Sequence, residues 1–313
     1  MRTAVVTGGA GFIGSHLARR LVSEGWKVIV IDNLSTGFKE NIPPEAEFIS
    51  ADISDKGFIA NLKPVRCDVI FHLAAQSSGE ISFDDPVYDL NTNCMSTILL
   101  LDWCRKNGVK RFIYTSSMSI YGDQEVQPVA ETAVPHPKSF YGAGKLASEA
   151  YISIYSKMGL DTTSLRLFNV YGPGQNMGNM RQGMVSIYMA YLLDRKELHV
   201  KGSADRYRDI IYIDDVINAY MKCIDRTETF GKSYNIATGR KTTVGELVSG
   251  LLKAFGYDKS GYPVRYSGST PGDTFGIYAD IGSFMHDTGW KPSVKLEDGI
   301  KIMVEWARGR AGR

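Results

Sequence analysis

The chain has 313 residues, of which 43% are hydrophobic and 22% are charged, and its formal net charge at pH 7 is +2. These values are ordinary for a globular protein, and the length is enough for two compact units. The small net charge and the absence of a long lysine or arginine run argue against a nucleic-acid partner. The apolar runs are too short for a membrane span or a leader peptide, so we expect no membrane partner.

The four cysteines are far apart in the sequence and form no Cys-x-x-Cys pair: Cys67, Cys94, Cys104 and Cys223. Zinc sites and disulfide frameworks use closely spaced cysteines, so we expect neither a metal site nor disulfides. Free thiols persist in reducing compartments, and buried ones behave as small apolar residues. The sequence therefore predicts a cytoplasmic protein.

Short apolar runs alternate with helical patterns over the first 170 residues. The runs that predict buried strands lie at residues 4–7, 27–32, 47–52, 68–74, 111–117 and 162–170. The patterns that predict helices lie at residues 13–21, around Phe58, at 90–106 and at 141–157. Continuous apolar strands separated by amphipathic helices indicate a parallel sheet covered on both faces. We therefore predict an α/β fold with a doubly wound parallel sheet.

The pattern changes after "YGPGQNMGN" at residues 171–179, a loop rich in glycine, proline and asparagine. The later elements are irregular, with helices expected at 183–193, from 244 and at 296–307. This organisation predicts a smaller α/β lobe on the C-terminal side, interleaved with returns to the first unit. We expect residues 1–170, with a return at about 209–238, to form the first unit, and residues 171–208 and 239–313 to form the smaller lobe.

"TGGAGFIG" at residues 7–14 follows the first strand and opens a helix, with glycines at Gly8, Gly11 and Gly14. Such a turn lets backbone N–H groups and the helix N-terminus approach a pyrophosphate. Asp32 ends the next strand, where a carboxylate can accept hydrogen bonds from the hydroxyls of an adenosine ribose. The alternative is a tight turn beside a surface aspartate. The strand–turn–helix context favours a dinucleotide, and the lack of an arginine after Asp32 favours NAD over NADP.

Asp52 and Ile53 lie at the end of the third predicted strand. At that place they either flank the adenine of a dinucleotide or, equally well, form an ordinary surface position.

"YGAGK" places Tyr141 and Lys145 four residues apart, on one face of a predicted helix. A free tyrosine titrates near pH 10, but a nearby ammonium and a positively charged nicotinamide would favour the phenolate. Ser117 ends the strand "RFIYTSS" and can hydrogen-bond the same substrate oxygen. Because parallel sheets present ligands at the carboxyl ends of their strands, we expect these side chains to meet there.

The landmarks "TGGAGFIG", "HLAAQ", "SSMSIYG", "YGAGK", "LRLFNVYGPG", "RYRDIIYIDDV" and "YNIATG" follow one another in order. In this the chain resembles the extended short-chain dehydrogenase/reductase family, which includes nucleotide-sugar epimerases and dehydratases. The resemblance implies a Rossmann-type domain that holds NAD and a smaller lobe that holds a nucleoside-diphosphate sugar. It implies catalytic roles for Ser117, Tyr141 and Lys145. The cofactor contacts that we predict are Gly8, Gly11, Phe12, Ile13, Gly14, Asp32, Asn33, Asp52, Ile53, Leu73, Ala74, Ala75, Tyr141 and Lys145.

Met118 and Ser119 follow the catalytic hydroxyl and narrow the reaction. The family's 4,6-dehydratases typically carry Asp and Glu at these two positions, decarboxylases carry Glu at the second, and GDP-fucose-forming epimerase/reductases carry Cys there. Neither Met118 nor Ser119 can transfer those protons. By elimination the resemblance implies a 4-epimerase acting through a 4-keto intermediate, on a UDP-hexose or a UDP-N-acetylhexosamine.

By resemblance, Asn169 would contact the sugar or diphosphate, and Arg208 the diphosphate, with Asp273 also at the substrate. An ion pair with Asp209, the next residue, is the alternative for Arg208. Many family members place a second diphosphate arginine three residues before the aspartate that matches Asp273, where this chain has Thr270. Arg181, Arg206 and Arg265 are the candidates to compensate, and the sequence does not choose among them.

Two further positions are ambiguous. Glu80 is expected near the sugar by alignment, either as a second proton carrier or hydroxyl ligand, or as an exposed loop glutamate. Ile277 falls where family epimerases control the room beside the sugar's C2 group. If it lines the pocket, an N-acetyl group fits; the alternative is a core residue of a strand.

The expected helices at 90–106 and 141–157 correspond to the pair that forms a four-helix dimer interface in relatives, so we expect a homodimer. Covering of the sheet would explain their apolar residues equally well. His72 and His199 lack metal-ligand partners at sensible spacing and are expected to be structural. Two rival functions stay open: a nucleotide-sugar dehydratase or reductase with a displaced acid, and a dinucleotide-sensing protein without chemistry. Retention of Ser117, Tyr141 and Lys145 together argues against the second.

Overall fold

Seven parallel strands form the central sheet, seen in a computed structural model that describes residues 1–62, 66–258 and 261–311. The strands are β1 (Thr3–Thr7), β2 (Lys27–Asp32), β3 (Glu47–Ser50), β4 (Val69–His72), β5 (Arg111–Ser117), β6 (Asp161–Leu167) and β11 (Lys232–Ile236). Their order in the sheet is β3-β2-β1-β4-β5-β6-β11, and every neighbouring pair is parallel. This is the doubly wound order of a Rossmann-type sheet, so the predicted fold class is confirmed.

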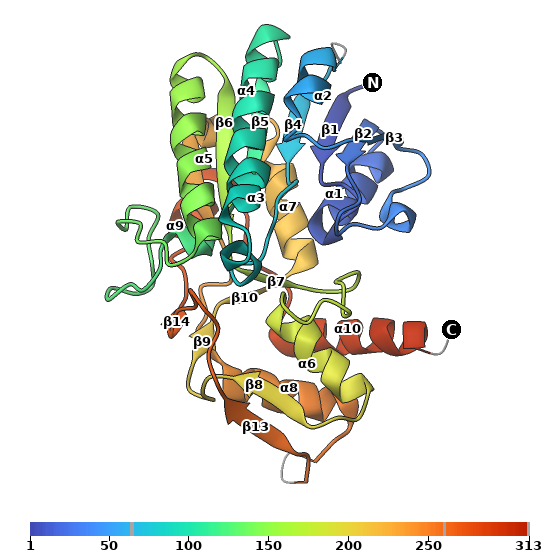
Figure 1. Ribbon diagram of the computed structural model, residues 1–313, viewed down its shortest axis with the longest axis vertical. Coiled ribbons are helices and arrows are strands. Elements are labelled where there is room, and N and C mark those ends of the chain that lie inside the picture. The colour runs from blue at the N-terminus through green and yellow to red at the C-terminus, as the bar shows by residue number, and fades with distance from the viewer. Residues whose placement is uncertain (63–65, 259–260, 312–313) are drawn as a thin grey trace.

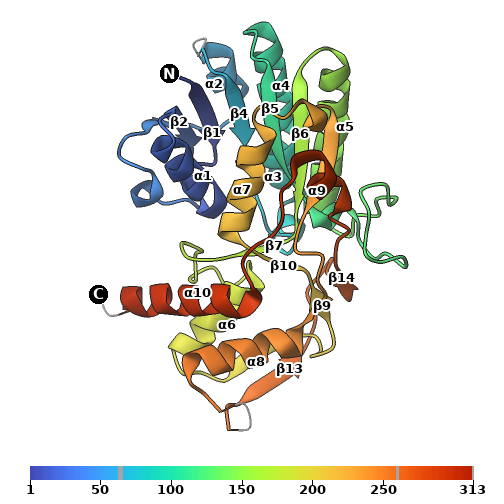
Figure 2. The same ribbon diagram turned by 180° about the vertical axis from the view of Figure 1, so that it is seen from behind.

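Helices cover both faces of the sheet (Figures 1 and 2). One face carries α1 (Phe12–Ser23) and α7 (Ile213–Cys223), and the other carries α2 (Lys56–Asn61), α4 (Ser96–Lys106) and α5 (Phe140–Lys157). Successive residues of β1 pack into separate clusters, Val6 toward α1 and Val5 toward α4, which explains why the strand is apolar throughout. Among the described residues, no helix has both the length and the hydropathy that a bilayer crossing needs.

The sheet-covering helices are joined by short helical segments. α3 (Pro86–Leu90) runs through the π-helical turn η3 (Asn91–Met95) into α4. The 3-10 turns are η1 (Lys39–Asn41), η2 (Ile81–Phe83), η4 (Met118–Ile120) and η5 (Thr227–Thr229). Of these, η4 continues directly from the end of β5, so Met118 and Ser119 stay at the carboxyl edge of the sheet.

A smaller α/β lobe lies against the carboxyl edge of the sheet (Figure 1). Its helices are α6 (Met184–Leu193), α8 (Val244–Phe255) and α10 (Leu296–Ala311), and α9 (Gly282–Thr288) lies back against β11. Its short strands are β8 (Leu198–Lys201) paired with β13 (Val264–Ser267), and β9 (Tyr207–Arg208) between β12 (Thr242–Thr243) and β14 (Gly276–Ile277). One apolar cluster extends from α1 through α7 to α6, α8 and α10, so a continuous core joins the two parts.

The apolar run at 162–170 forms two strands where the sequence predicts one. β6 ends at Leu167, and the Phe168 amide still donates to the carbonyl of Ile236, the last residue of β11 (3.1 Å). The next strand, β7 (Asn169–Tyr171), leaves the sheet and pairs with β10 (Ile210–Tyr212). The chain stops pairing with β11 where β11 ends and then pairs with β10. A local apolar pattern does not show which strand a segment pairs with, so the sequence did not predict this break.

Candidate active site

The glycine-rich turn between β1 and α1 is packed too tightly for side chains. Gly8 has φ +72°, and a Cβ atom on Gly14 would lie 2.2 Å from the Gly8 carbonyl oxygen. Gly11 is the N-cap of α1, and no side chain at this cap accepts a hydrogen bond from the first N–H groups of the helix. The first N–H groups of α1 are therefore available for an anion, as at other helix N-termini.

Asp32 supports this turn from the end of β2. Its carboxylate, only 8% exposed as a residue, accepts from the backbone N–H of Ala10 (3.0 Å) and of Leu34 (2.8 Å). Asn33 donates to Asp52 (3.1 Å), which links the ends of β2 and β3. Burial raises the pKa of Asp52, but hydrogen bonds from Ser54 and Asn33 outweigh this and hold the pKa below its usual value. Asp52 is thus an ionised group at this end of the site.

A cavity of about 400 Å³ extends along the carboxyl ends of the strands from this turn to the smaller lobe. Its wall contains every residue predicted as a cofactor contact: Gly8, Gly11, Phe12, Ile13, Gly14, Asp32, Asn33, Asp52, Ile53, Leu73, Ala74, Ala75, Tyr141 and Lys145. Of the predicted substrate contacts, Ser117 and Asn169 line the cavity, whereas Glu80, Arg208, Asp273 and Ile277 are not in its wall.

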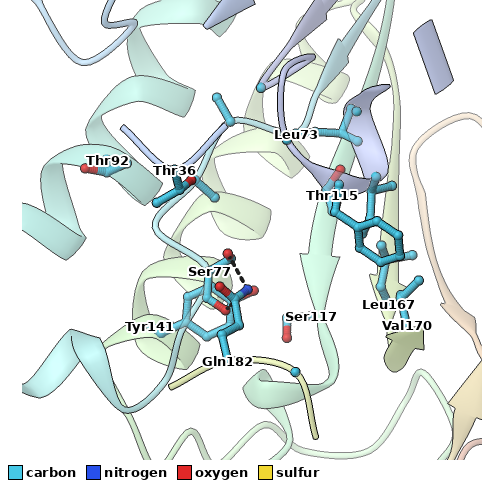
Figure 3. A pocket seen from close by; sticks show the side chains of 18 of the residues that line it. Thr36, Leu73, Ser77, Thr92, Thr115, Ser117, Tyr141, Leu167, Val170 and Gln182 are labelled. Carbon is cyan, nitrogen blue, oxygen red and sulfur yellow. Dashed lines mark hydrogen bonds between the residues drawn. The ribbon is translucent and has the colours of Figure 1, made fainter. Parts of the chain in front are cut away.

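Ser117, Tyr141 and Lys145 meet in this cavity, and Figure 3 shows the first two among its lining side chains. Ser139 caps α5, accepting from the Gly142 N–H (3.1 Å), which fixes the first turn that carries Tyr141. Ser117 lies near enough to the Tyr141 hydroxyl to lower its pKa. One turn further along α5, Lys145 donates to the Thr115 carbonyl (2.9 Å). The geometry holds two hydroxyl groups and the amino group of Lys145 at one end of the cavity.

Burial has the largest effect on the pKa values of Tyr141 and Lys145, which both lie on α5. It raises the pKa of Tyr141 to about 12, against the opposing effect of the Ser117 hydrogen bond. It lowers the pKa of Lys145 to about 7. The Lys145 nitrogen lies 5.8 Å from the centre of the Tyr141 ring. Thus the lysine does not by itself bring the tyrosine into the range of a neutral-pH base.

The stretch after Ser117 brings no carboxylate to the cavity. Ser117 caps η4 by accepting from the Ser119 N–H (3.1 Å), and its hydroxyl donates to the Ser119 hydroxyl (3.2 Å). Met118 and Ser119 both line the cavity. Among the described residues that form its wall, the only carboxylates are Asp32 and Asp52, at the glycine-turn end. The Ser117 end therefore offers hydroxyl groups and, from the described wall, no carboxylate to act as a base at carbon.

Arg208 is buried in the smaller lobe and pairs with Asp273. Its guanidinium contacts the Asp273 carboxylate and donates to the carbonyls of Thr274 (2.9 Å) and Phe275 (3.2 Å). Asp209 instead accepts from the backbone of Thr238 (2.7 Å). No ion pair between Arg208 and its sequence neighbour Asp209 occurs in the described part of the chain, so the alternative of such a pair is wrong.

Of the three arginines that the sequence left open, Arg206 joins this cluster. It contacts the same Asp273 carboxylate, and its side chain is 12% exposed. Arg181 and Arg265 are 41% and 56% exposed and pair with other acids, Arg181 with Asp84 (2.6 Å). The Thr274 hydroxyl beside the cluster is buried without a hydrogen-bond partner. Two guanidinium groups on one carboxylate leave a surplus positive charge.

Neither Glu80 nor Ile277 lines the cavity. Glu80 pairs with Lys201 of β8 (2.9 Å) and with Arg181 (3.4 Å), and so ties η2 to the smaller lobe. Ile277 is 1% exposed and lies in an apolar cluster with Phe168. Met118 packs against that cluster, and both Met118 and Phe168 line the cavity.

Several cavity residues were not predicted from the sequence. Gln182 donates to the Ser77 hydroxyl (2.6 Å), a contact across the cavity mouth shown dashed in Figure 3. Gln175 lines the cavity with a buried side-chain oxygen that has no hydrogen-bond partner. Gln175 lies within the Gly/Pro/Asn loop and Gln182 follows it; the loop composition gave no reason to single out either amide. Asp89, buried behind α5, carried no motif at all.

Comparison with known proteins gives a consistent result. The profile of a family described as "NAD dependent epimerase/dehydratase family" matches residues 4–237. A putative UDP-glucose 4-epimerase of Methanocaldococcus jannaschii is 35% identical over 306 residues, covering 97% of this chain and 98% of that protein. A UDP-glucose 4-epimerase of Mycolicibacterium smegmatis is 36% identical over 323 residues, covering 99% and 100%. The crystal structure of a UDP-glucose 4-epimerase with UDP-glucose from Thermotoga maritima superposes with a TM-score of 0.94 at 38% identity and covers 99% of each chain.

Proposed function

This chain belongs to the NAD-dependent epimerase/dehydratase family, and we propose that it is an NAD-dependent enzyme that inverts C4 of a UDP-hexose or UDP-N-acetylhexosamine. The two relatives from Methanocaldococcus jannaschii and Mycolicibacterium smegmatis, which match over nearly their whole length, are named for this reaction with UDP-glucose. The proposed reaction is therefore inversion at C4. The experiment below decides whether the enzyme accepts sugars with an acetamido group.

The residues of the glycine-turn end fit NAD. The turn has no space for a side chain at Gly14, and the uncapped start of α1 suits a pyrophosphate. Asp32 keeps acceptor capacity beyond its two backbone partners and suits the adenosine ribose. Ile53 and Leu73 give apolar walls toward the adenine and nicotinamide. We assign Tyr141 and Lys145 to the nicotinamide ribose as well as to catalysis.

The catalytic roles follow from the hydroxyl pair. When bound, NAD would take the hydrogen from C4 and return it to either face of a 4-keto sugar, and its positive nicotinamide would favour the Tyr141 phenolate. Tyr141 takes the proton from the C4 hydroxyl and gives it back, acting as base and then as acid. Ser117 donates a hydrogen bond to the same oxygen in both directions. Lys145 keeps a positive charge near the phenolic oxygen.

One observation carries the choice of epimerisation. Beyond Ser117 and Tyr141, the cavity presents Met118 and Ser119 where proton transfer at carbon would need an acid or a thiol. Asp32 and Asp52, the carboxylates of the described wall, lie at the opposite, cofactor end. One proton carrier for the C4 hydroxyl is enough for epimerisation, whereas water elimination needs a second one.

We assign the substrate diphosphate to Arg208 and Arg206. Val185 of α6 lines the cavity, and the positive charges of both arginines act to lower the pKa of Tyr188, one helical turn later. The arginine cluster therefore lies near α6, which also contributes to the cavity wall. Its surplus positive charge and the unpartnered Thr274 hydroxyl suit phosphate oxygens. Arg206 then supplies the second cation that Thr270 cannot.

The direct test is product analysis by ¹H NMR after incubation with UDP-glucose, UDP-galactose and their N-acetyl analogues. We expect UDP-glucose and UDP-galactose to interconvert without added reductant. A 4-keto-6-deoxy product would establish a dehydratase instead, and NAD binding without any turnover would establish a cofactor-sensing protein.

We further infer a homodimer in a reducing compartment, the cytoplasm. α3 and α5 pack against each other and both expose apolar side chains, with Val87 at 67% and Ile154 at 53% exposure. Such a face is consistent with an interface between copies. The four cysteines are free, as a reducing compartment requires. Light scattering should give twice the chain mass, and Ile154→Glu should give the monomer; a wild-type monomer would refute the dimer.

A further inference from the structure

Lys145 is a buried cation without an adjacent carboxylate. It is 2% exposed, and its nitrogen donates to the Thr115 carbonyl (2.9 Å). None of the ion pairs among the described residues includes it. The rings of Tyr114 and Tyr141 lie 4.8 and 5.8 Å from the nitrogen. In such surroundings the ammonium ion is stable only if a charge of opposite sign lies nearby.

Two carboxylates act on Lys145 through space, Asp89 more than Glu149. Glu149 is committed elsewhere: it forms a buried ion pair with Arg166 (2.7 Å) and accepts from the Ser116 hydroxyl (2.5 Å). Its charge is therefore balanced locally. Asp89 is the carboxylate whose charge no described cation neutralises by contact.

Asp89 is held in place by amides. It is 1% exposed, and one of its oxygens accepts from Gln76 (2.7 Å) and from Asn93 (3.0 Å). The other oxygen, Oδ2, is buried without a hydrogen-bond partner. A Cβ on Gly144 would lie 3.4 Å from it, so α5 passes directly over this oxygen between Tyr141 and Lys145. Burial has the largest effect on Asp89 and raises its pKa above the usual value. The hydrogen bonds from the two amides and the charge of Lys145 act in the opposite direction and limit this rise.

We propose that Asp89 is a positioning residue whose buried carboxylate is the counter-charge that keeps Lys145 an ammonium ion beside Tyr141. This rests on the proposed function for the roles of Tyr141 and Lys145. Asp89 touches neither the substrate nor the reacting atoms. It acts through Lys145: with the ammonium retained, the proton of Tyr141 can leave, and without it the helix would hold two neutral groups.

The remaining titratable groups around Lys145 do not replace Asp89. From β5, Tyr114 is buried with its pKa raised far above the usual value. From β4, His72 is buried, and its pKa is lowered to about 3. Both are neutral at pH 7 and contribute no negative charge. Among the described residues with an electrostatic effect on Lys145, only Asp89 supplies a negative charge that no cation neutralises by contact.

Asp89→Asn tests the charge at nearly constant shape. The asparagine carbonyl can still accept from Gln76 and Asn93, and its amide takes the place of the unpartnered oxygen. We expect both limbs of the pH profile of kcat to move to lower pH by about one unit. The alkaline limb moves because Lys145 loses its proton more easily, and the acid limb because Tyr141 no longer faces a carboxylate. A merely structural role lowers kcat at all pH values and leaves the limbs in place.

Asp85→Asn is the matched control. Asp85 caps the same helix, accepting from the Tyr88 N–H (2.9 Å), and asparagine caps equally well. It removes the same charge at an exposed place, so its limbs should not move. A shift of equal size in Asp85→Asn would overturn the proposal. If Asp89→Asn does not fold, Asp89→Ser removes the same charge with a smaller side chain.

A second measurement does not depend on activity. The titration of Lys145 is followed by ¹³Cε NMR of labelled lysine in the protein without added NAD, with Lys145→Arg to assign the signal. Its midpoint should fall by about one pH unit in Asp89→Asn and stay in place in Asp85→Asn. An unchanged midpoint in Asp89→Asn overturns the proposal. If UDP-sugars are not epimerised, the proposed function fails, and the midpoint still decides the role of Asp89.

Discussion

His72 should make the protein sensitive to mild acid. Its ring ends β4 between the Thr7 hydroxyl (2.8 Å) and the Thr97 hydroxyl (3.0 Å), and it is 1% exposed. Burial lowers its pKa to about 3, with a smaller contribution from the charge of Lys145. An unfolded histidine titrates near pH 6.5, so between these pH values only the unfolded chain binds the proton. The stability due to neutral His72 is present above pH 6.5 and is lost as the pH falls toward 3.

The size of the effect follows from linkage. Each pH unit inside that window lowers the free energy of unfolding by about 1.4 kcal/mol. Between pH 7 and pH 5, His72 should therefore remove about 2 kcal/mol. Because Thr7 precedes the glycine turn, we expect NAD affinity to fall along with this stability.

Urea unfolding at pH 7 and pH 5 measures the difference for the wild type, His72→Gln and His136→Gln. His72→Gln should be less stable at pH 7 but lose about 2 kcal/mol less than the wild type between the two pH values. His136 is exposed, and its replacement should leave the wild-type pH dependence. If His72→Gln has the same pH dependence as the wild type, the histidine is not held neutral and the reasoning is refuted.

Three further predictions concern the site. Gly14→Ala should weaken NAD binding in calorimetry about tenfold or more, because its Cβ would lie 2.2 Å from the Gly8 oxygen; an unchanged Kd would remove the turn from the cofactor site. Arg206→Gln should raise the Kd for UDP about tenfold through loss of a charge-assisted contact, and the exposed Arg181→Gln should not; equal effects would contradict the assignment of Arg206. Ile277→Ala should lower the free energy of unfolding by about 2–5 kcal/mol in urea, since the residue is 1% exposed. A change in selectivity between acetylated and plain sugars, without loss of stability, would instead place Ile277 in the pocket wall.

The sheet and the glycine-turn end were predictable because their signals are local. An apolar run followed by glycines indicates a strand and a turn, and the chain order of strands and helices then indicates the parallel sheet. Gly8, Gly14 and Asp32 lie within 25 residues of one another along the chain, and the βαβ unit brings them together whatever the rest of the protein does.

The substrate end was less predictable because its contacts join distant segments. The Asp273 carboxylate holds Arg206 and Arg208, more than 60 residues earlier in the chain. Glu80 pairs with Lys201 across 121 residues. No periodicity or motif encodes such pairs. The sequence could name the arginines, but the choice among them needed the three-dimensional structure.

The titration behaviour was the least predictable part. An arrangement of tyrosine and lysine four residues apart suggests a lowered tyrosine pKa, whereas burial raises it to about 12. Burial depends on everything packed around α5, including Asp89 from a segment without a recognisable pattern. The spacing of two residues along a helix predicts that their side chains are neighbours. Their protonation states depend on the packing around them, which the spacing does not predict.

The most direct test of the account is the fate of a deuterium at C4 of UDP-glucose. If hydrogen leaves C4 and returns to it within one closed site, UDP-galactose should carry the deuterium at C4, and ¹H NMR should show no solvent hydrogen there. Tyr141→Phe should slow this conversion by about 10²–10⁴ while UDP still binds. Loss of the deuterium to solvent, or its appearance at C6 of a 4-keto-6-deoxy sugar, would contradict the account.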